Sequence, residues 1–417
     1  IPYILVENDR AAMALMASAF YGHPSRSLRM VGITGTKGKT TVSYYVKAIL
    51  EEAGITCGLI GTTGSMIGGK WLKNTLTTPD PIELQQTLRA MVDAQVQAVC
   101  MEVSAHAIAM HRLEGIVFEA SCFTNLSQDH LDFFGTMENY FAAKCRFFTP
   151  KHTRNAAINL DDERAGELIK QLTIPHSTFG IWHKADIFAR DIEMSEGGVA
   201  FKLILWNEQV YPVYLRMMGM FSVYNALSAV AVALIMGVKP EAICSALESV
   251  RAVPGRAEVL ETNTPFKVVL DYSHTPSALS NILETVRGFV RRRIILVFGC
   301  GGDRDHGKRP LMGEIAGRMA DYSVLTSDNP RSEDPMEILA TIEEGIKPTK
   351  GEYTVIENRR EAIRHALDKA GDGDVVILAG KGHETYQEIR GTKRPFDEKL
   401  IVHDILSTRP VQENRHA

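Results

Sequence analysis

A glycine-rich stretch near the start of the chain has the residue types and spacing needed to hold a phosphate. It reads Gly35-Thr36-Lys37-Gly38-Lys39-Thr40-Thr41 and lies between an apolar run, residues 30–34, and a segment with helical periodicity that starts at residue 42. Glycine lets backbone N–H groups approach an anion, and a helix N-terminus adds roughly half a positive charge. Lys39 can reach the β- and γ-phosphates of a nucleotide, and the Thr40 hydroxyl can bind Mg²⁺. The strict Walker pattern has a glycine where Ile33 stands, so an ordinary strand-to-helix turn is the alternative.

Candidate metal ligands follow the next apolar runs. Glu102 lies at the end of the run 98–103, and Asp129, His130 and Asp132 follow the run 119–124. Ligands of open α/β sheets gather at the carboxyl ends of the strands. Glu102 is therefore either a metal ligand beside a triphosphate or a solvated acid at a strand end. The Asp129–Asp132 cluster suits a divalent ion, although Mg²⁺ prefers oxygen ligands.

One lysine, Lys144, lies inside the apolar helical segment 140–148. Burying an ammonium group is costly unless the group is paired or chemically modified. The alternative is a side chain that extends along apolar surface until its charge reaches water.

Charged groups follow three apolar runs in the second half of the chain. Arg304 follows the run 293–298, Arg331 follows 322–325, and Glu384 follows 374–378. Arginine binds a planar carboxylate through two hydrogen bonds, and a carboxylate binds an ammonium group. Together the three predict a pocket for an amino acid, whereas charged loops without a common target are the alternative.

The elements that must position these residues alternate between apolar runs and helical patterns. Such alternation predicts an α/β fold with parallel sheets covered on both faces. We expect a P-loop-type mononucleotide-binding central domain with a small antiparallel β addition near 186–216, plus a Rossmann-like C-terminal α/β domain. The predicted boundaries are 1–28 for the end of an N-terminal domain or linker, 29–253 for the ATP-binding domain, and 254–417 for the amino-acid-binding domain.

The composition excludes several classes of protein. In 417 residues, 45% are hydrophobic and 23% charged, and the net charge of −4 gives no general affinity for nucleic acid. No apolar stretch reaches 18 residues, and no two of the six cysteines form a C-x-x-C pair. We expect a cytoplasmic monomer with free thiols, with no membrane insertion and no nucleic-acid partner. Because the chain starts at Ile1, we also expect a longer parent protein.

The order of the motifs is more specific than any one of them. From about residue 20 to 405 the chain resembles the Mur ligase superfamily and, within it, the family that adds the third residue of the peptidoglycan peptide. The segments that carry the resemblance are Gly35 to Thr41, Glu102-Val103-Ser104, Thr124-Asn125-Leu126, Asp129-His130-Leu131-Asp132, Lys144, Asp271-Tyr272-Ser273-His274-Thr275-Pro276, Asp328-Asn329-Pro330-Arg331 and Gly380-Lys381-Gly382-His383-Glu384.

The resemblance implies a reaction and assigns residues to it. ATP would phosphorylate the γ-carboxylate of D-Glu in UDP-MurNAc-L-Ala-D-Glu, and an amino acid would attack the acyl phosphate. The implied catalytic residues are Lys39, Glu102, His130 and Lys144. The nucleotide would contact Gly35, Thr36, Lys37, Gly38, Lys39, Thr40, Thr41, Asn225, Arg256, Asp271 and His274. Two Mg²⁺ ions would bind Thr40, Glu102, His130 and Lys144 as a carbamate. The UDP-sugar peptide would contact Thr77, Thr78, Ser104 and Arg112, and the amino acid Arg304, Asp328, Asn329, Arg331, Gly380 and Glu384.

The sequence 328–331 also indicates which amino acid is added. Asp-Asn-Pro-Arg is the form in relatives that use meso-diaminopimelate, and lysine-adding relatives lack the arginine. Departures from the family pattern are Ser222 where Asn is usual, Ser273 where Ala is usual, and the lack of most of an N-terminal uridine-binding domain of about a hundred residues. The alternatives are a folylpolyglutamate-, cyanophycin- or L-lysine-type ligase, or a non-catalytic nucleotide-binding subunit.

Overall fold

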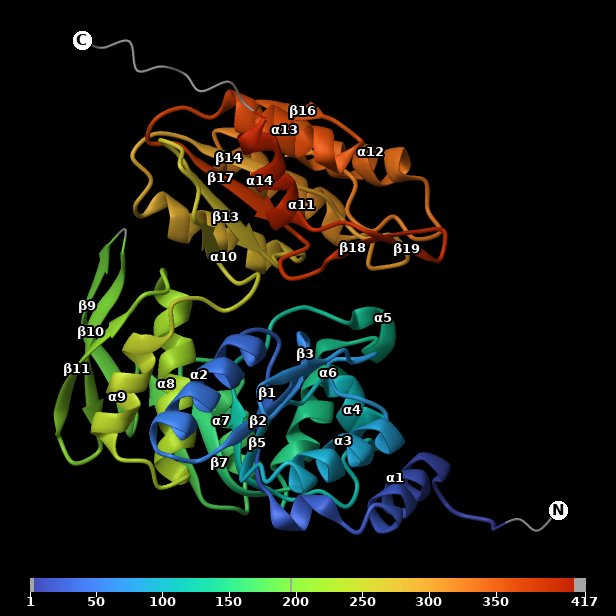
Figure 1. Cartoon of the computed structure of the whole chain (residues 1–417), viewed down its shortest axis with the longest axis vertical. Helices are drawn as coiled ribbons and strands as arrows, with labels where there is room; N and C mark the ends of the chain where they lie inside the picture. The colour runs from blue at the N-terminus through green and yellow to red at the C-terminus, as the bar shows by residue number, and fades with distance from the viewer. Residues whose placement is uncertain (1–3, 196, 409–417) are drawn as a thin grey trace. The chain divides into compact units, whose positions relative to one another are not determined.

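The computed structural model describes residues 4–195 and 197–408. The chain divides into two compact units between Val253 and Pro254, and each unit has its own sheet (Figure 1). Both sheets contain parallel strands connected through helices, so the predicted α/β class is confirmed.

The first unit is built on one sheet of eleven strands. Its central strands are parallel, with β1 between β5 and β6, and both edges are antiparallel. In spatial order the strands are β11 (Val210–Leu215), β10 (Gly198–Leu205), β9 (Ile187–Ser195), β8 (His176–Gly180), β7 (Thr153–Asn159), β6 (Phe118–Phe123), β1 (Arg29–Thr34), β5 (Ala98–Glu102), β2 (Cys57–Gly61), β3 (Gly64–Ile67) and β4 (Lys70–Leu72). The predicted antiparallel addition extends this sheet, because β9 pairs in parallel with β8.

Both faces of the central parallel strands of the first sheet are buried. Val31 and Ile33 of β1 belong to the apolar cluster that includes α2, α8 and α9, whereas Met30 belongs to a second cluster that includes α3. This period-2 alternation with both sets apolar is typical of a parallel sheet between two helical layers. The helices are α1 (Asp9–Phe20), α2 (Lys39–Glu52), α3 (Pro81–Asp93), α4 (Ala105–Ala109), α5 (Leu131–Phe134), α6 (Met137–Cys145), α7 (Ala165–Gln171), α8 (Met220–Ile235) and α9 (Pro240–Ser249).

The second unit has a six-stranded sheet and a separate hairpin. The sheet order is β12 (Glu258–Leu260), β13 (Lys267–Asp271), β17 (Val375–Ala379), β14 (Ile294–Phe298), β15 (Tyr322–Leu325) and β16 (Tyr353–Val355), and the hairpin is β18 (Tyr386–Ile389) with β19 (Thr392–Pro395). Helices α13 (Arg359–Lys369) and α14 (Glu398–Ser407) share one apolar cluster with alternate strand residues. Helices α10 (Pro276–Arg287), α11 (Lys308–Met319) and α12 (Pro335–Ile346) also pack on the sheet.

Two features of the composition have structural counterparts. All six cysteines are free thiols. Within 4–195 and 197–408, no helix combines the length and the apolar character that a membrane crossing requires.

Candidate active site

The glycine-rich loop connects β1 to α2, as predicted, and its two glycines sit where larger residues would clash. Gly35 has φ +149°, and a Cβ there would lie 1.9 Å from Thr124 Oγ1. Gly38 precedes α2 with φ +87°, and a Cβ there would lie 2.4 Å from Asn225 Oδ1. Asn225, predicted to contact the nucleotide, is therefore in the immediate surroundings of the loop. The first N–H groups of α2 have no partner within the helix, which favours an anion at this end.

The segment after β6 holds the loop in shape. The Asn125 side chain accepts from Lys37 N (2.9 Å) and donates to Lys37 O (3.1 Å), and Thr124 Oγ1 donates to the same carbonyl (2.6 Å). Lys39 Nζ donates to the carbonyl oxygens of Gly35 (2.9 Å) and Thr36 (3.0 Å). The lysine therefore lies folded over the loop where a phosphate would bind, and both ends of the loop are rigidly supported.

Glu102 is a buried carboxylate at the end of β5, next to the loop. Only 1% of the residue is exposed. Its Oε2 accepts from the hydroxyls of Thr40 (3.0 Å) and Thr62 (3.0 Å), and its Oε1 accepts from Thr62 N (2.9 Å). A Cβ at Gly61 would lie 2.2 Å from Oε1, so glycine is needed for this approach. The prediction that Thr40 and Glu102 share one site agrees with this geometry, which the alternative of a solvated acid does not fit.

The residues predicted to hold the acceptor substrate meet on the other side of Glu102. Thr78 Oγ1 donates to the Glu102 carbonyl oxygen (2.8 Å) and accepts from Ser104 N (3.0 Å). Arg112 donates to Thr78 O (2.9 Å) and pairs with Asp80, with Nε to Oδ1 at 2.9 Å. Thr77 joins the group because its Oγ1 lies 3.2 Å from Thr62 Oγ1. All four predicted residues therefore lie in one cluster.

Lys144 is fully buried on α6, which excludes the alternative of a side chain that reaches water. The residue is 1% exposed, and its ammonium lies 4.5 Å from the centre of the Tyr140 ring. In the part of the chain that the structure describes, no carboxylate lies within ion-pair distance of it, although Asp129 and Asp162 are near enough to favour its charged form. Burial, reinforced by the nearby positive charge of Lys39, holds the pKa of Lys144 well below its ordinary value.

Tyr140 connects Lys144 to the glycine-rich loop and to His130. Its hydroxyl lies 3.3 Å from Thr36 Oγ1, and its ring centre lies 6.1 Å from that of His130. His130 also packs edge-on against His106, with centroids 4.7 Å apart, and its Nε2 lies 3.6 Å from Asp129 Oδ2. Burial lowers the pKa of His130, which favours the neutral imidazole that binds metals. Within the described residues, no group of three or more His, Cys, Asp or Glu side chains is arranged around a metal position.

The residues that we expected to contact the nucleotide from the second unit surround Tyr272. The Arg256 guanidinium lies 4.6 Å from its ring centre, and the His274 ring lies 4.7 Å away. Asp271 accepts from Ala257 N (2.8 Å) and Ser273 N (2.8 Å). The Asp271 carboxylate therefore serves to hold the segments on which Arg256 and His274 lie.

The predicted amino-acid pocket is assembled around Asn329. Its Nδ2 donates to Glu384 Oε2 (2.9 Å), which brings the loops after β15 and β17 together. Burial, with Asp328 nearby, raises the pKa of Glu384. Arg331 has φ +52°, donates to Gly302 O (2.6 Å) and lies 3.5 Å from Glu388, measured from Nε to Oε2. A Cβ at Gly380 would lie 2.7 Å from Asp328 Oδ2, so Gly380 also belongs to the pocket wall.

Arg304 is the one predicted pocket residue without a contact to this group. Its side chain is exposed, and NH1 donates to the carbonyl oxygen of its neighbour Asp303 (3.2 Å). Its role toward an amino acid stays a prediction.

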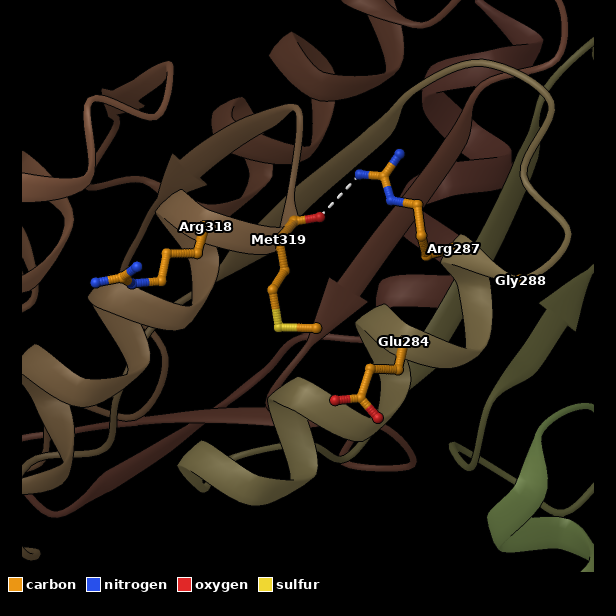
Figure 2. Close-up of a pocket in the computed structure, with 5 residues that line it drawn as sticks. All are labelled: Glu284, Arg287, Gly288, Arg318 and Met319. Carbon is orange, nitrogen blue, oxygen red and sulfur yellow. Dashed lines mark hydrogen bonds between the residues drawn. The ribbon is translucent and has the colours of Figure 1, made fainter.

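A separate pocket of about 620 Å³ lies at the C-terminal ends of α10 and α11 (Figure 2). Its lining residues are Glu284, Arg287, Gly288, Arg318 and Met319, and Arg287 donates to Met319 O at 2.8 Å. Helix α10 starts just after the carboxyl end of β13 and runs back along the sheet, so the pocket lies at the opposite edge from the amino-acid pocket. The two are distinct.

Comparisons with known proteins identify the family to which this site belongs. Residues 33–233 match the Mur ligase middle domain, and residues 255–382 match the domain described as "Mur ligase, glutamate ligase domain". The chain is 48% identical over 408 residues to the UDP-N-acetylmuramoyl-L-alanyl-D-glutamate--2,6-diaminopimelate ligase of Caldanaerobacter subterraneus subsp. tengcongensis, covering 98% of this chain and 84% of the relative. The chain belongs to the Mur ligase family.

Solved structures extend the comparison. A structure of UDP-N-acetylmuramoyl-L-alanyl-D-glutamate--2,6-diaminopimelate ligase is 34% identical with a TM-score of 0.67, over 95% of this chain and 83% of that one. Mycobacterium tuberculosis folylpolyglutamate synthase, complexed with ADP and AMPPCP, superimposes with a TM-score of 0.75 over 89% of this chain and 92% of that one. At 19% identity this second likeness shows the fold alone. The family resemblance expected from the motifs is thus confirmed, with the diaminopimelate ligases as relatives of high identity.

Three contributors to this Mur ligase site are absent from the residues predicted by sequence. Tyr140 has a signal that could have been used, because it precedes Lys144 by four residues and so lies on the same helix face. Thr62 has no such signal, since threonines between glycines, as in Gly61-Thr62-Thr63-Gly64, are common in surface turns. The third, Lys381, stands between two glycines directly after a buried strand.

Proposed function

We propose that this Mur ligase adds meso-diaminopimelate to the D-glutamyl γ-carboxylate of UDP-MurNAc-L-Ala-D-Glu, with ATP as the energy source. Relatives of 42–48% identity that carry this activity in their names support the acceptor and the amino acid. The observation that carries the choice of amino acid is the grouping of Asn329, Arg331 and Glu384. The distal end of diaminopimelate carries both a carboxylate and an ammonium group, and L-lysine offers only the ammonium.

The first unit would activate the acceptor. Transfer of a phosphoryl group to a carboxylate brings like charges together, so fixed cations and N–H dipoles are needed where the charge develops. Lys39 and the N-terminus of α2 would supply them, and the clamp by Asn125 fixes the loop before the substrate binds. The cluster of Thr78, Ser104 and Arg112 beside Glu102 would hold the acceptor.

The residues at the loop fit a magnesium ion. Glu102 is buried, Thr40 and Thr62 surround it with hydroxyl oxygens, and among the described residues no lysine or arginine lies within ion-pair distance of its carboxylate. Mg²⁺ is usually held by one or two carboxylates, with phosphate oxygens and water completing the shell, so a cluster of three acids is not required. When bound, the ion would neutralise charge on the phosphates.

A second magnesium at His130 requires a change of charge at Lys144. An ammonium would repel the ion, whereas a carbamate on the same nitrogen is an anionic oxygen ligand. The burial of Lys144 and its strongly lowered pKa support the carbamate, because both favour the uncharged amine, which is the form that reacts with carbon dioxide. Tyr140 would then orient the modified side chain toward the loop.

The experiment that tests this function is mass spectrometry of the product formed from UDP-MurNAc-L-Ala-D-Glu, ATP and Mg²⁺ with a panel of amino acids. We expect a tripeptide product with meso-diaminopimelate. Preference for L-lysine would reject the amino-acid assignment while leaving the ligase intact. Phosphate release that does not depend on acceptor and amino acid would instead favour a nucleotide-binding regulator.

A further inference from the structure

A fully buried lysine lies at the centre of the amino-acid pocket. Lys381 is 0% exposed. Its Nζ donates to Asn329 Oδ1 (3.0 Å) and to Tyr386 O (2.8 Å), and it lies 3.4 Å from Asp328 Oδ1 and 3.6 Å from Glu384 Oε2. Three segments that are separate in sequence therefore meet on one ammonium group: the loop after β15, the loop after β17 and the start of β18.

The ammonium determines which way the Asn329 amide points. Lysine has only donors, so the atom that it contacts must be the amide oxygen. Glu388 N donates to the same oxygen at 2.9 Å, so a second donor also requires the amide oxygen, and not the amide nitrogen, at this position. The amide nitrogen must then face Glu384, where it donates to Oε2 at 2.9 Å. One oxygen of Glu384 is thus fixed by Asn329, and the carboxylate is held in a single orientation.

Lys381 also balances charge. Asp328 is buried and the Glu384 side chain is 15% exposed, and each has a carboxylate oxygen within 4 Å of the Lys381 nitrogen; Asp328 Oδ1 has no hydrogen bond in the described part of the chain. Without this cation the two neighbouring carboxylates would repel each other, which favours the uptake of a proton by one of them. A protonated Glu384 could not attract an ammonium group. With Lys381 present, the group of three keeps one net negative charge.

We propose that Lys381 is a positioning residue for the incoming amino acid, which orients Glu384 through Asn329 and keeps that carboxylate ionised to receive the ammonium of a diamino acid. The proposal rests on the proposed amino-acid pocket and assigns to Lys381 a role without direct contact to the substrate. A positioning role predicts that replacement of Lys381 changes the KM of only one of the three substrates, the amino acid, whereas loss of a lysine that only stabilises the fold would change all three KM values.

The test compares Lys381→Met with Lys381→Gln in steady-state assays of the full chain. We expect Lys381→Met to raise KM for the amino acid roughly ten- to a hundredfold, the equivalent of one charge-assisted hydrogen bond. KM for ATP and for the UDP-linked acceptor should stay within about threefold. Lys381→Gln keeps a donor toward Asn329 but no charge and should lie between. Lys393→Met is the matched control, because this lysine is exposed on β19 of the adjoining hairpin, and its kinetics should equal those of the unmodified chain.

Thermal unfolding and binding of an ATP analogue establish that each variant is folded. Unchanged KM for the amino acid in a folded Lys381→Met protein, or an equal rise for all three substrates, would overturn the proposal. If Lys381→Met does not fold, Lys381→Gln is scored by the same criteria, and failure of both to fold would assign Lys381 to stability alone. The assay uses whichever amino acid the unmodified chain prefers, so an error in the diaminopimelate assignment would be recognised separately.

Discussion

Replacement of Glu102 by glutamine tests whether this residue binds a metal ion or only accepts hydrogen bonds that hold the fold together. Glutamine has nearly the same shape, and its oxygen can still accept from Thr62 N. Its NH₂ group would then face the hydroxyls of Thr40 and Thr62, which can accept as well as donate. Every hydrogen bond of the site can therefore be kept, and only the charge is lost.

The expected magnitudes differ sharply between folding and function. The hydrogen bonds to Glu102 weaken when the acceptor becomes neutral, but the cost of burying a carboxylate disappears as well. We expect the free energy of unfolding to change by less than about 2 kcal/mol. Opposite unit charges at 4 Å attract by about 4 kcal/mol at an effective dielectric constant of 20. Even half of that value, about 2 kcal/mol, would weaken magnesium binding roughly thirtyfold.

The assay is phosphate release as a function of Mg²⁺ concentration, with urea unfolding measured on the same preparations. Glu119→Gln is a matched control, because Glu119 lies near the amino end of β6 in the same sheet and pairs with Arg29. We expect Glu102→Gln to need far more Mg²⁺ and Glu119→Gln to behave like the unmodified chain. A Glu102→Gln protein with an unchanged magnesium requirement would show that Glu102 only anchors Thr40 and Thr62, and the metal-site reasoning would be wrong.

Three further predictions follow from single contacts. In a fluorescent-nucleotide titration, Gly35→Ala should weaken binding at least about tenfold, because the new Cβ would clash with Thr124 and the backbone φ is +149°. Gly54→Ala is the control, since its φ is +78° but the space around it is open; it should lower the free energy of unfolding by only about 1 kcal/mol and leave nucleotide binding unchanged. Lys144→Met should flatten the pH dependence of the free energy of unfolding, measured in urea. Between the lowered pKa of Lys144 in the folded chain and its ordinary value of 10.5, the unfolded chain binds one more proton, so an unmodified amine makes stability rise with pH. A carbamate would not have this effect, and mass spectrometry would detect it as the added mass of one carbon dioxide. Arg331→Lys, which removes the planar fork but keeps the charge, should raise KM for diaminopimelate about tenfold and leave turnover with L-lysine unchanged in the amino-acid panel.

The sheets could be predicted from sequence because their strands are continuous apolar runs. The run 30–34 became β1, Arg29–Thr34, and the run 322–325 became β15 with the same bounds. The short strands β4, Lys70–Leu72, and β19, Thr392–Pro395, are not predicted, because their residues are exposed and form no continuous apolar run of strand length. Their pairing depends on partners brought close by the rest of the fold, which no local pattern reports.

The site was predictable where residues act from their own strand ends. Glu102 is the last residue of a buried strand and Asn329 follows another, so the topology of the sheets places both at strand ends. The contacts that hold them come from elsewhere: Thr62 lies 40 residues before Glu102, and Lys381 lies 52 residues after Asn329. Contacts between residues so far apart in sequence produce no periodic pattern in the sequence. Only the hydrogen bonds of the folded structure identify Thr62 and Lys381 as partners of these residues.

The two buried lysines show why residue type alone does not determine a role. Both are at most 1% exposed; Lys144 lies within an apolar helix, and Lys381 lies between two glycines after a buried strand. Lys381 has two carboxylates within 4 Å of its nitrogen, so its positive charge is compensated within the protein. Lys144 has an aromatic ring at 4.5 Å and no ion pair among the described residues, and the carboxylates of Asp129 and Asp162 offset burial only in part, since the pKa of Lys144 stays well below its ordinary value. An uncompensated buried ion costs several kcal/mol, which neutralisation or modification removes. The first lysine is therefore suited to hold a pocket in one state, and the second to change its chemical state when carbon dioxide, metal or nucleotide arrives.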